Sequence, residues 1–382
     1  MSQDIISVLV VDDSALMRNL ISRIIDGTPG MVVAGKAMNG NFALQKLERL
    51  HPDVIILDIE MPQMNGLEFL EERRKRGIDI PVVVLSSIAQ KGARVTMDAL
   101  SLGASDFLLK PSGPVSEDIH TVAGQLTEMV RGYGTEYRRR KGRTGGGAES
   151  AARSSEAPPP KPPTPPATPT DPAAPASPGA PAKPVAPSGT TEIIAIGIST
   201  GGPNALRKVF AAIDDSLAVP IVVVQHMPAG FTLEFAKSLD RICPLAVKEA
   251  EEGDALQPGR ILIAPGNRHL VVERRASEGV IHLHDEAPCN GHRPSADVLF
   301  ASVAQHYGSR ALAVIMTGMG RDGAAELGTI HRAGGITVGQ DAASCVVYGM
   351  PKVAFDLGHV QHQVPLHLMA ETICRLADDK RA

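Results

Sequence analysis

The sequence predicts two doubly wound α/β domains, each with a mostly parallel sheet, joined by a linker without regular structure. Three observations lead to this fold class. Short apolar runs, typical of buried parallel strands, occur in both halves of the chain, and polar residues follow several of them directly. A proline-rich stretch lies between the two halves. The length of 382 residues is typical of two or three domains.

Composition and charge exclude several classes of function. The net charge of -4 is unfavourable for a general nucleic-acid binder. The four cysteines show no CxxC spacing and are typical of free thiols in a cytosolic protein. The N-terminus has no signal sequence, and the longest apolar runs are far shorter than the roughly 20 residues of a membrane span. We therefore expect a cytoplasmic protein that neither binds nucleic acid nor inserts directly into a membrane.

In the N-terminal half, charged side chains follow three of the apolar runs. Residues 7–11 precede Asp12 and Asp13, residues 54–57 precede Asp58, and residues 107–109 lead to Lys110. Since the carboxyl ends of parallel strands meet at one edge of a sheet, three carboxylates and one ammonium should gather there.

This set of side chains has the chemistry of a phosphorylatable aspartate. Crowded carboxylates repel one another unless a divalent cation lies between them, and an oxygen-only site suits Mg²⁺. Asp58 would be the nucleophile, Asp12 and Asp13 would hold the metal with it, and Lys110 would pair with the phosphoryl oxygens. Ser86, at the end of the run 81–85, offers a hydroxyl to those oxygens, and Phe107 would follow its movement. The competing interpretation is that the aspartates only cap helices.

Residues 5 to about 125 resemble a two-component receiver domain. The matching motifs are Val11-Asp12-Asp13-Ser14, the run from Leu57 to Gly66, Leu85-Ser86-Ser87 and Lys110-Pro111. Many receivers have threonine where this chain has Ser86, a change that keeps the hydroxyl. The resemblance implies a flavodoxin-like fold of five parallel strands with helices on both faces, and a cis peptide before Pro111. We assign residues 1–130 to this domain.

Residues 131–190 are expected to form a flexible linker rich in proline and alanine. Of the 30 positions from 158 to 187, 14 are proline, which disfavours both helix and sheet. The basic run at residues 138–141 is most simply the solvated end of the receiver's last helix, with a role in docking as the alternative.

The domain predicted at residues 191–382 brings a serine, a histidine and an aspartate to strand ends. Ser199 follows the run 193–198, His226 follows 220–225, and Asp322 follows the run 311–316 after a glycine-rich turn. Such a set performs nucleophilic acyl transfer: the imidazole takes the serine proton, and the carboxylate orients the imidazole. Each residue also has a structural interpretation, as a helix cap, an ordinary histidine and a turn aspartate.

Glycines beside the serine indicate an oxyanion hole. Gly201, Gly202, Gly318 and Gly320 should leave backbone N–H groups accessible, and we expect the amides of Thr200 and Met319 to provide the donors.

Three competing motifs are weaker. The string Gly197-Ile198-Ser199-Thr200-Gly201 fits GxSxG, but an α/β-hydrolase places its acid before its histidine, whereas the order here is Ser, His, Asp. The dinucleotide fingerprint GxGxxG fails because Ser199 occupies its middle glycine. The stretch from His282 to His292 has enough ligands to suggest a metal site, yet it follows no standard zinc spacing.

Taken together, the motifs of both domains resemble those of a chemotaxis protein-glutamate methylesterase. Those in the second domain are the run 197–203, Gln225-His226-Met227-Pro228, Gly266-Asn267-Arg268-His269, Gly291-His292-Arg293-Pro294-Ser295 and the run 317–323. The resemblance implies that Ser199, His226 and Asp322 form the catalytic triad. It also implies a hydrolase that releases methanol from γ-glutamyl methyl esters on the cytoplasmic helices of chemoreceptors. Deamidation of receptor glutamines is a further activity of the family, and no cofactor is expected for the ester chemistry.

The resemblance also implies control by phosphorylation. A chemotaxis histidine kinase would phosphorylate Asp58 in the presence of Mg²⁺, and the unphosphorylated receiver would cover the catalytic cleft. The linker is longer than a tight tether requires, which leaves the docking of the domains open. His292, Arg293 and Ser295 either line the cleft or position the receptor helix, or they form a turn with a helix cap at Ser295. Two other functions remain: a non-enzymatic response regulator whose second domain binds a partner, and a small-molecule esterase with a receiver attached.

Overall fold

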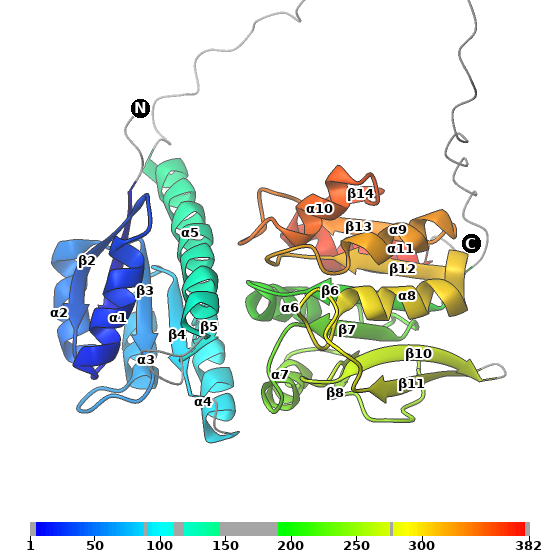
Figure 1. Cartoon of the computed structure of the whole chain (residues 1–382), viewed down its shortest axis with the longest axis horizontal. Coiled ribbons are helices and arrows are strands. Elements are labelled where there is room, and N and C mark those ends of the chain that lie inside the picture. Colours follow the sequence, from blue (N-terminus) through cyan, green and yellow to red (C-terminus); the bar gives the residue numbers. More distant parts are fainter. Residues whose placement is uncertain (1–4, 88–89, 111–117, 146–189, 276–277, 379–382) are drawn as a thin grey trace, which may run out of the picture.

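The computed structural model describes residues 5–87, 90–110, 118–145, 190–275 and 278–378. These residues form two α/β domains that lie side by side (Figure 1), as the sequence predicts. Pro111 and residues 146–189 lie outside the described residues, as therefore do the expected cis peptide before Pro111 and most of the expected linker. None of the helices in the described ranges combines the length and the apolar character needed to cross a bilayer.

The N-terminal domain is a five-stranded parallel sheet with the strand order β2-β1-β3-β4-β5. This confirms the predicted flavodoxin-like receiver. The strands are β1 (Ile6–Val11), β2 (Met31–Ala37), β3 (Val54–Asp58), β4 (Val82–Ser86) and β5 (Asp106–Leu109). The helices are α1 (Ala15–Asp26), α2 (Gly40–Leu50), α3 (Gly66–Lys75), α4 (Gln90–Ser101) and α5 (Asp118–Gly145).

Sequence signals explain where these elements begin. Every residue of β3 and β4 is buried, as expected for central strands covered on both faces. Ser14 and Asn39 cap α1 and α2 with side-chain oxygens that accept backbone N–H groups. Asn65 and Glu68 form a capping box at the start of α3.

The C-terminal domain has a seven-stranded parallel sheet with the order β14-β13-β12-β6-β7-β9-β8, which confirms the second doubly wound domain. Its strands are β6 (Ile193–Ile198), β7 (Ile221–Gln225), β8 (Ala246–Glu249), β9 (Arg260–Ile263), β12 (Ala311–Ile315), β13 (Ile336–Gln340) and β14 (His362–Val364). An antiparallel hairpin, β10 (His269–Arg275) with β11 (Glu278–His284), packs against α8.

Helices cover both faces of this sheet. They are α6 (Gly202–Ala211), α7 (Phe231–Asp240), α8 (Ala296–Tyr307), α9 (Ala324–Arg332), α10 (Met350–Asp356) and α11 (Met369–Asp378), with short 3-10 turns at Gly308–Arg310 and Leu366–Leu368. The chain winds from β6 toward β8 on one side and from β12 toward β14 on the other, so the direction reverses between β6 and β12. Such a switch point leaves a crevice at the carboxyl ends of the two strands.

The receiver's last helix extends past residue 130, where the sequence analysis placed the end of the domain. Helix α5 continues to Gly145, so residues 131–145, which we expected in the linker, are helical. The physical reason is that Tyr133 and Tyr137 are buried against the receiver and hold this part of the helix in place. The basic run within it is not simply solvated, because the Arg138 guanidinium lies 2.8 Å from Asp53 and that of Arg139 donates to the Ala343 carbonyl of the other domain.

The two domains meet along the α4, β5 and α5 edge of the receiver (Figure 1). Helix α4 packs against α7, and Phe107 of β5 stacks on Phe231 at the start of α7, with ring centroids 5.2 Å apart. Asp106 of β5 accepts a hydrogen bond of 2.7 Å from the Gly201 N–H, at the N-terminal end of α6. The receiver therefore rests on the edge of the second domain that carries the serine turn.

We predict that Phe300→Ala destabilises the C-terminal domain strongly. The Phe300 ring is fully buried, and it leaves no room for a side chain at Gly197 of β6. The cavity should cost about 3–5 kcal/mol in the free energy of unfolding, measured by denaturant titration. Phe355→Ala is the control, because this ring is 49% exposed and its loss should change stability by about 0.5 kcal/mol or less. Equal effects of the two changes would contradict the packing described for α8.

Candidate active site and phosphoacceptor site

Ser199 lies on the tight turn between β6 and α6, at the switch point of the sheet. The turn is held by hydrogen bonds from the Ser199 N–H to the Thr317 carbonyl (3.0 Å) and from the Gly202 N–H to the Ser199 carbonyl (2.8 Å). Gly201 has a φ of 81°, a left-handed conformation that glycine adopts without strain. The serine side chain is thereby placed in the crevice between the two halves of the sheet.

The structure brings His226 and Asp322 together from the ends of β7 and β12. His226 Nε2 lies 2.8 Å from Asp322 Oδ2, although 96 positions separate the two residues. With the carboxylate accepting from Nε2–H, the lone pair of the imidazole is on Nδ1. Nδ1 is buried and has no hydrogen-bond partner among the described residues, and His226 lines the same cleft as Ser199. A base with a free lone pair thus lines the same cleft as the serine.

The Asp322 carboxylate is fully buried and accepts several hydrogen bonds besides that of His226. The Ser295 hydroxyl donates to Oδ1 at 2.6 Å, the Asn290 amide donates to Oδ1 at 2.9 Å, and the Ala296 N–H donates to Oδ2 at 2.6 Å. Burial by itself would raise the pKa of Asp322, but His226, Ser295 and Asn290 hold that pKa well below its usual range. The carboxylate therefore stays ionised and can stabilise a protonated imidazole.

Asn290 and Ser295 are site residues that sequence reasoning did not assign to the triad. Ser295 was interpreted as a helix cap or as a residue of the cleft, and it does cap α8, since its hydroxyl oxygen accepts from the Val298 N–H. The same hydroxyl donates to Asp322. The motif from Gly291 to Ser295 was the sequence signal for a functional loop here. The motif does not indicate which aspartate its side chains contact.

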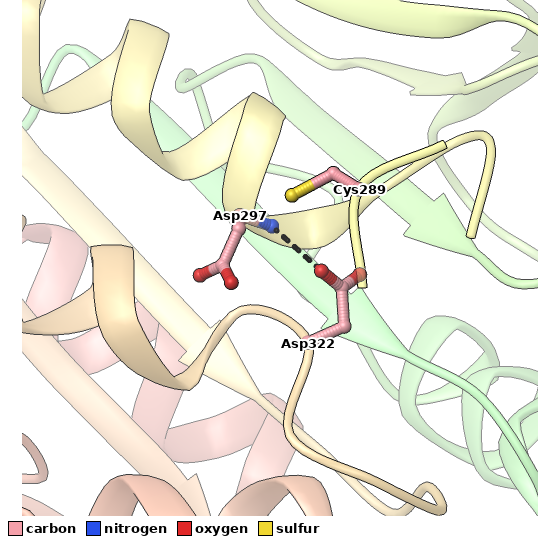
Figure 2. A group of neighbouring side chains, drawn as sticks. All are labelled: Cys289, Asp297 and Asp322. Atoms are coloured by element: carbon pink, nitrogen blue, oxygen red, sulfur yellow. Dashed lines mark hydrogen bonds between the residues drawn. The ribbon is translucent and has the colours of Figure 1, made fainter. Parts of the chain in front are cut away.

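Cys289, Asp297 and Asp322 form a group with ligand atoms within 4.8 Å of one another (Figure 2). The carboxylates of this group are already engaged, because Asp297 accepts from the Glu326 N–H (3.0 Å) and the Asn290 amide (2.7 Å). Hydrogen bonds account for the proximity without an ion. Around His282 and His284, where the sequence suggested a metal site, no three side chains among the described residues place ligand atoms within 4.8 Å of one another.

The structure leaves fewer amides free for an oxyanion hole than the glycine pattern suggested. The Gly201 N–H donates to Asp106, that of Gly202 to Ser199, and that of Gly318 to the Val347 carbonyl at 3.0 Å. These three were expected to be accessible, but turn closure and the receiver contact engage them. Thr200 and Met319, our proposed donors, adjoin Ser199: Thr200 lines the cleft, and Gly318, which precedes Met319, packs against the serine Cβ.

Both domains line the cleft at Ser199. Phe107, Lys110 and Met129 of the receiver contribute to its walls, together with Ser199, His226 and His292. Burial raises the pKa of Asp106 to about 6, while its hydrogen bond from Gly201 opposes that rise. The receiver thus borders the candidate active site directly.

The receiver's predicted phosphoacceptor residues also come together. Oxygens of Asp12, Asp13 and Asp58 lie within 4.8 Å of one another, and the Lys110 ammonium lies 2.7 Å from Asp58 Oδ2 and 3.4 Å from Asp12 Oδ2. Burial raises the pKa of Asp58 to about 6, an effect that Lys110 opposes. Three crowded carboxylate oxygens, one of them exposed at Asp13, fit the hard oxygen ligands of Mg²⁺.

The two other predicted switch residues contact groups other than Asp58 in the described part of the chain. Ser86 Oγ lies 2.6 Å from the Thr96 hydroxyl of α4 and donates to the Ser87 carbonyl. The Phe107 ring contacts Phe231 of the other domain. In this structure Ser86 is tied to α4, and Phe107 belongs to the domain contact.

Fold and site define a response regulator: a receiver joined to an α/β domain with a serine and a buried His–Asp pair at its switch point. Residues 8–121 match the model of the response regulator receiver domain, and residues 194–373 match that of the CheB methylesterase family. The chain belongs to this family, because it is more than 50% identical to two relatives over nearly the whole length of both chains.

Two relatives carry the name protein-glutamate methylesterase/protein-glutamine glutaminase. The one from Treponema denticola is 56% identical and covers 97% of this chain and 98% of its own, and the one from Treponema pallidum is 52% identical, with 97% and 96% covered. Among solved structures, the catalytic domain of Thermotoga maritima CheB methylesterase is 37% identical, with a TM-score of 0.48 over 49% of this chain and 99% of that chain. The response regulator domain of Thermotoga maritima CheB is 44% identical, with a TM-score of 0.32 over 34% and 97%.

We predict that Asp13→Asn weakens Mg²⁺ binding by roughly tenfold or more, because it removes one of three carboxylate charges around the cation. Isothermal titration calorimetry of the full chain would measure the affinity. Asp13 is exposed, so the fold should be unaffected. Glu48→Gln removes a charge from an exposed position of α2 and should leave the affinity unchanged. Equal affinities for Asp13→Asn and the wild type would exclude Asp13 as a ligand.

Proposed function

We propose that this chain is a phosphorylation-activated serine hydrolase that removes methyl groups from γ-glutamyl methyl esters of chemoreceptors. The single observation that carries the proposal is the His226–Asp322 pair, whose free Nδ1 lies in the same cleft as Ser199. Family membership and the names of the relatives support methyl esters of protein glutamates as the substrate class. The cytoplasmic helices of chemoreceptors would be the substrate, which places the enzyme in the cytoplasm.

The chemistry follows from the three groups. Ser199 Oγ attacks the ester carbonyl while His226 Nδ1 takes its proton, and the Thr200 and Met319 amides donate to the developing oxyanion. The tetrahedral intermediate collapses, the C–O bond to the methoxy group breaks, and methanol leaves with the proton from His226. Water, deprotonated by His226, then attacks the acyl-enzyme and releases the glutamate carboxylate and Ser199. Asp322 stays ionised throughout and stabilises the imidazolium.

The same groups can deamidate receptor glutamines. The protonated His226 would then deliver its proton to a departing amine, and ammonia would leave in place of methanol. The printed names of both relatives include this glutaminase activity.

The receiver would control this chemistry through phosphorylation of Asp58. A chemotaxis histidine kinase would supply the phosphoryl group, and Asp12, Asp13 and Asp58 would hold the Mg²⁺ that neutralises its charge. Lys110 would pair with the phosphoryl oxygens. In this proposal, neither the Mg²⁺ ion nor Lys110 takes part in the ester hydrolysis itself.

We place the coupling between the two sites on β5. This strand ends beside Lys110, and its residues Asp106 and Phe107 make the contacts with Gly201 and Phe231. Lys110 is only a few residues from Asp106 and Phe107. A movement of Lys110 toward a phosphoryl group would therefore be transmitted to the domain contact over a short stretch of chain. The unphosphorylated receiver would narrow access to Ser199, and phosphorylation would loosen the contact between the domains.

The proposed control divides the chain into three parts. The receiver includes α5, a linker follows, and the catalytic domain starts at about residue 191.

Ser199→Ala should abolish methanol release from methylated chemoreceptor fragments, with a loss of roughly 10³-fold or more. Wild-type release should rise when Mg²⁺ and a small phosphodonor are added. Asp58→Ala is the matched control: it should keep basal release and lose the stimulation. No release from folded, phosphorylated wild-type protein would contradict the proposed activity, and stimulation that persists in Asp58→Ala would contradict its control by Asp58.

Gly132→Ala should raise basal activity without a phosphodonor. A Cβ at Gly132 of α5 would collide with the backbone carbonyl of Val346 in the catalytic domain, so the change disfavours the docked arrangement. Overpacking costs about 1–3 kcal/mol, which corresponds to a rise in basal activity of roughly 5- to 150-fold, limited by the rate of the phosphorylated enzyme.

Gly124→Ala is the matched control for this change. It lies on the same helix and gains the same helix propensity, but nothing lies within 4 Å of the added Cβ. Basal methanol release should therefore rise in Gly132→Ala and stay at the wild-type level in Gly124→Ala. Equal basal rates in both variants would show that the docked arrangement does not restrain the enzyme.

A further inference from the structure

A tight turn at residues 289–292 reaches the His–Asp pair from the segment before α8. Cys289 and His292 exchange two backbone hydrogen bonds, of 3.0 Å and 2.8 Å. Asn290 and Gly291 between them have φ values of 51° and 80°, the left-handed conformations that such a two-residue turn requires. The backbone of the turn is therefore fixed, and the side chains of Asn290 and His292 project from it.

The Asn290 side chain holds the acid of the pair. Its amide nitrogen donates to Asp322 Oδ1 at 2.9 Å and to Asp297 Oδ2 at 2.7 Å. One NH₂ group thus bridges two buried carboxylates that would otherwise repel each other, and it fixes the rotation of the Asp322 carboxylate. The other oxygen of Asp322, Oδ2, accepts from His226 Nε2 and from the Ala296 N–H.

The His292 side chain covers the base of the pair. Its ring lies flat on the His226 ring, with centroids 3.8 Å apart and an angle of 9° between the planes. Burial, reinforced by His226, lowers the pKa of His292 to about 4, so His292 is neutral at pH 7 and does not repel an imidazolium. A flat neutral ring on one face restricts tilting and rotation of the His226 ring.

We propose that Asn290 and His292 are positioning residues of the esterase, which act through Asp322 and His226 to fix the imidazole that takes the Ser199 proton. The inference rests on the proposed function and deepens it. The hydrogen bond to Asp322 fixes only one edge of the imidazole, and the stacked ring of His292 fixes its plane. A misplacement of about 1 Å of a reacting group can cost roughly 10²-fold in rate. A residue that acts in this way changes kcat and leaves KM almost unchanged, whereas a residue that binds the receptor helix changes KM.

The test uses the full chain, phosphorylated with a small phosphodonor, and methanol release from methylated receptor fragments. His292→Ala should lower kcat by roughly 10- to 100-fold, with KM within about threefold of wild type. His292→Phe keeps a flat, neutral ring and should recover most of the lost kcat. Asn290→Gly keeps the left-handed backbone without the amide, and its kcat should fall to a similar extent.

Two matched controls separate positioning from general effects of the substitutions. His282→Ala removes a histidine on β11 that pairs with Glu252 outside the cleft, and His51→Gly replaces another left-handed residue, in the receiver. Both should keep wild-type kcat. Thermal unfolding of every variant checks the fold, and His292→Phe keeps the test valid if His292→Ala unfolds.

The outcomes distinguish this inference from the function on which it rests. Wild-type activity with unchanged kcat in His292→Ala and Asn290→Gly would overturn the positioning roles alone. A raised KM with unchanged kcat would assign His292 to substrate binding and would also overturn them. The absence of methanol release from wild-type protein would overturn the proposed function, and this inference with it.

Discussion

The buried, ionised carboxylate of Asp322 is the constraint around which the catalytic domain is arranged. A charge without solvent is costly unless hydrogen bonds and an opposite charge compensate it. Its compensation comes from distant parts of the chain: the N-terminus of α8, the turn at Asn290 and the end of β7 that carries His226. Satisfying one carboxylate therefore fixes three segments relative to one another, and those segments line the cleft at Ser199.

The parallel sheets explain why both sites lie where they do. In each domain, polar residues directly follow buried apolar strands. Their polar side chains therefore lie together at the carboxyl edge of the sheet, because the strands themselves are buried in an apolar core. In the receiver this edge gathers Asp12, Asp13 and Asp58, and in the second domain it gathers Ser199, His226 and Asp322. The switch point between β6 and β12 provides the crevice that a substrate needs.

The contact between the domains links the two edges through one short strand. Asp106 places a carboxylate at the N-terminal end of α6, where it accepts from the Gly201 N–H and where the helix dipole favours a negative charge. Phe107 adds an aromatic contact, and Lys110 completes the phosphoacceptor site on the same stretch of chain. Close spacing in sequence makes β5 a short physical path between the Lys110 side chain and the cleft.

The sequence by itself determined the two α/β domains, the parallel strands and the family, because buried strands and the residues after them are local patterns. The same logic places Asp58 and Ser199 at sheet edges. The predicted domain boundary at residue 130 falls inside α5, because burial of Tyr133 and Tyr137 against the receiver holds the second half of this helix.

Only the tertiary structure decided which side chains meet. It paired Asp106 with the Gly201 N–H, 95 positions away in the other domain, and so removed an amide that the glycine pattern had offered to an oxyanion hole. It also placed the His292 ring on His226 and the Asn290 amide on Asp322. The physical reason is that such contacts depend on the packing of several elements at once, whereas a sequence pattern fixes only the element to which each residue belongs.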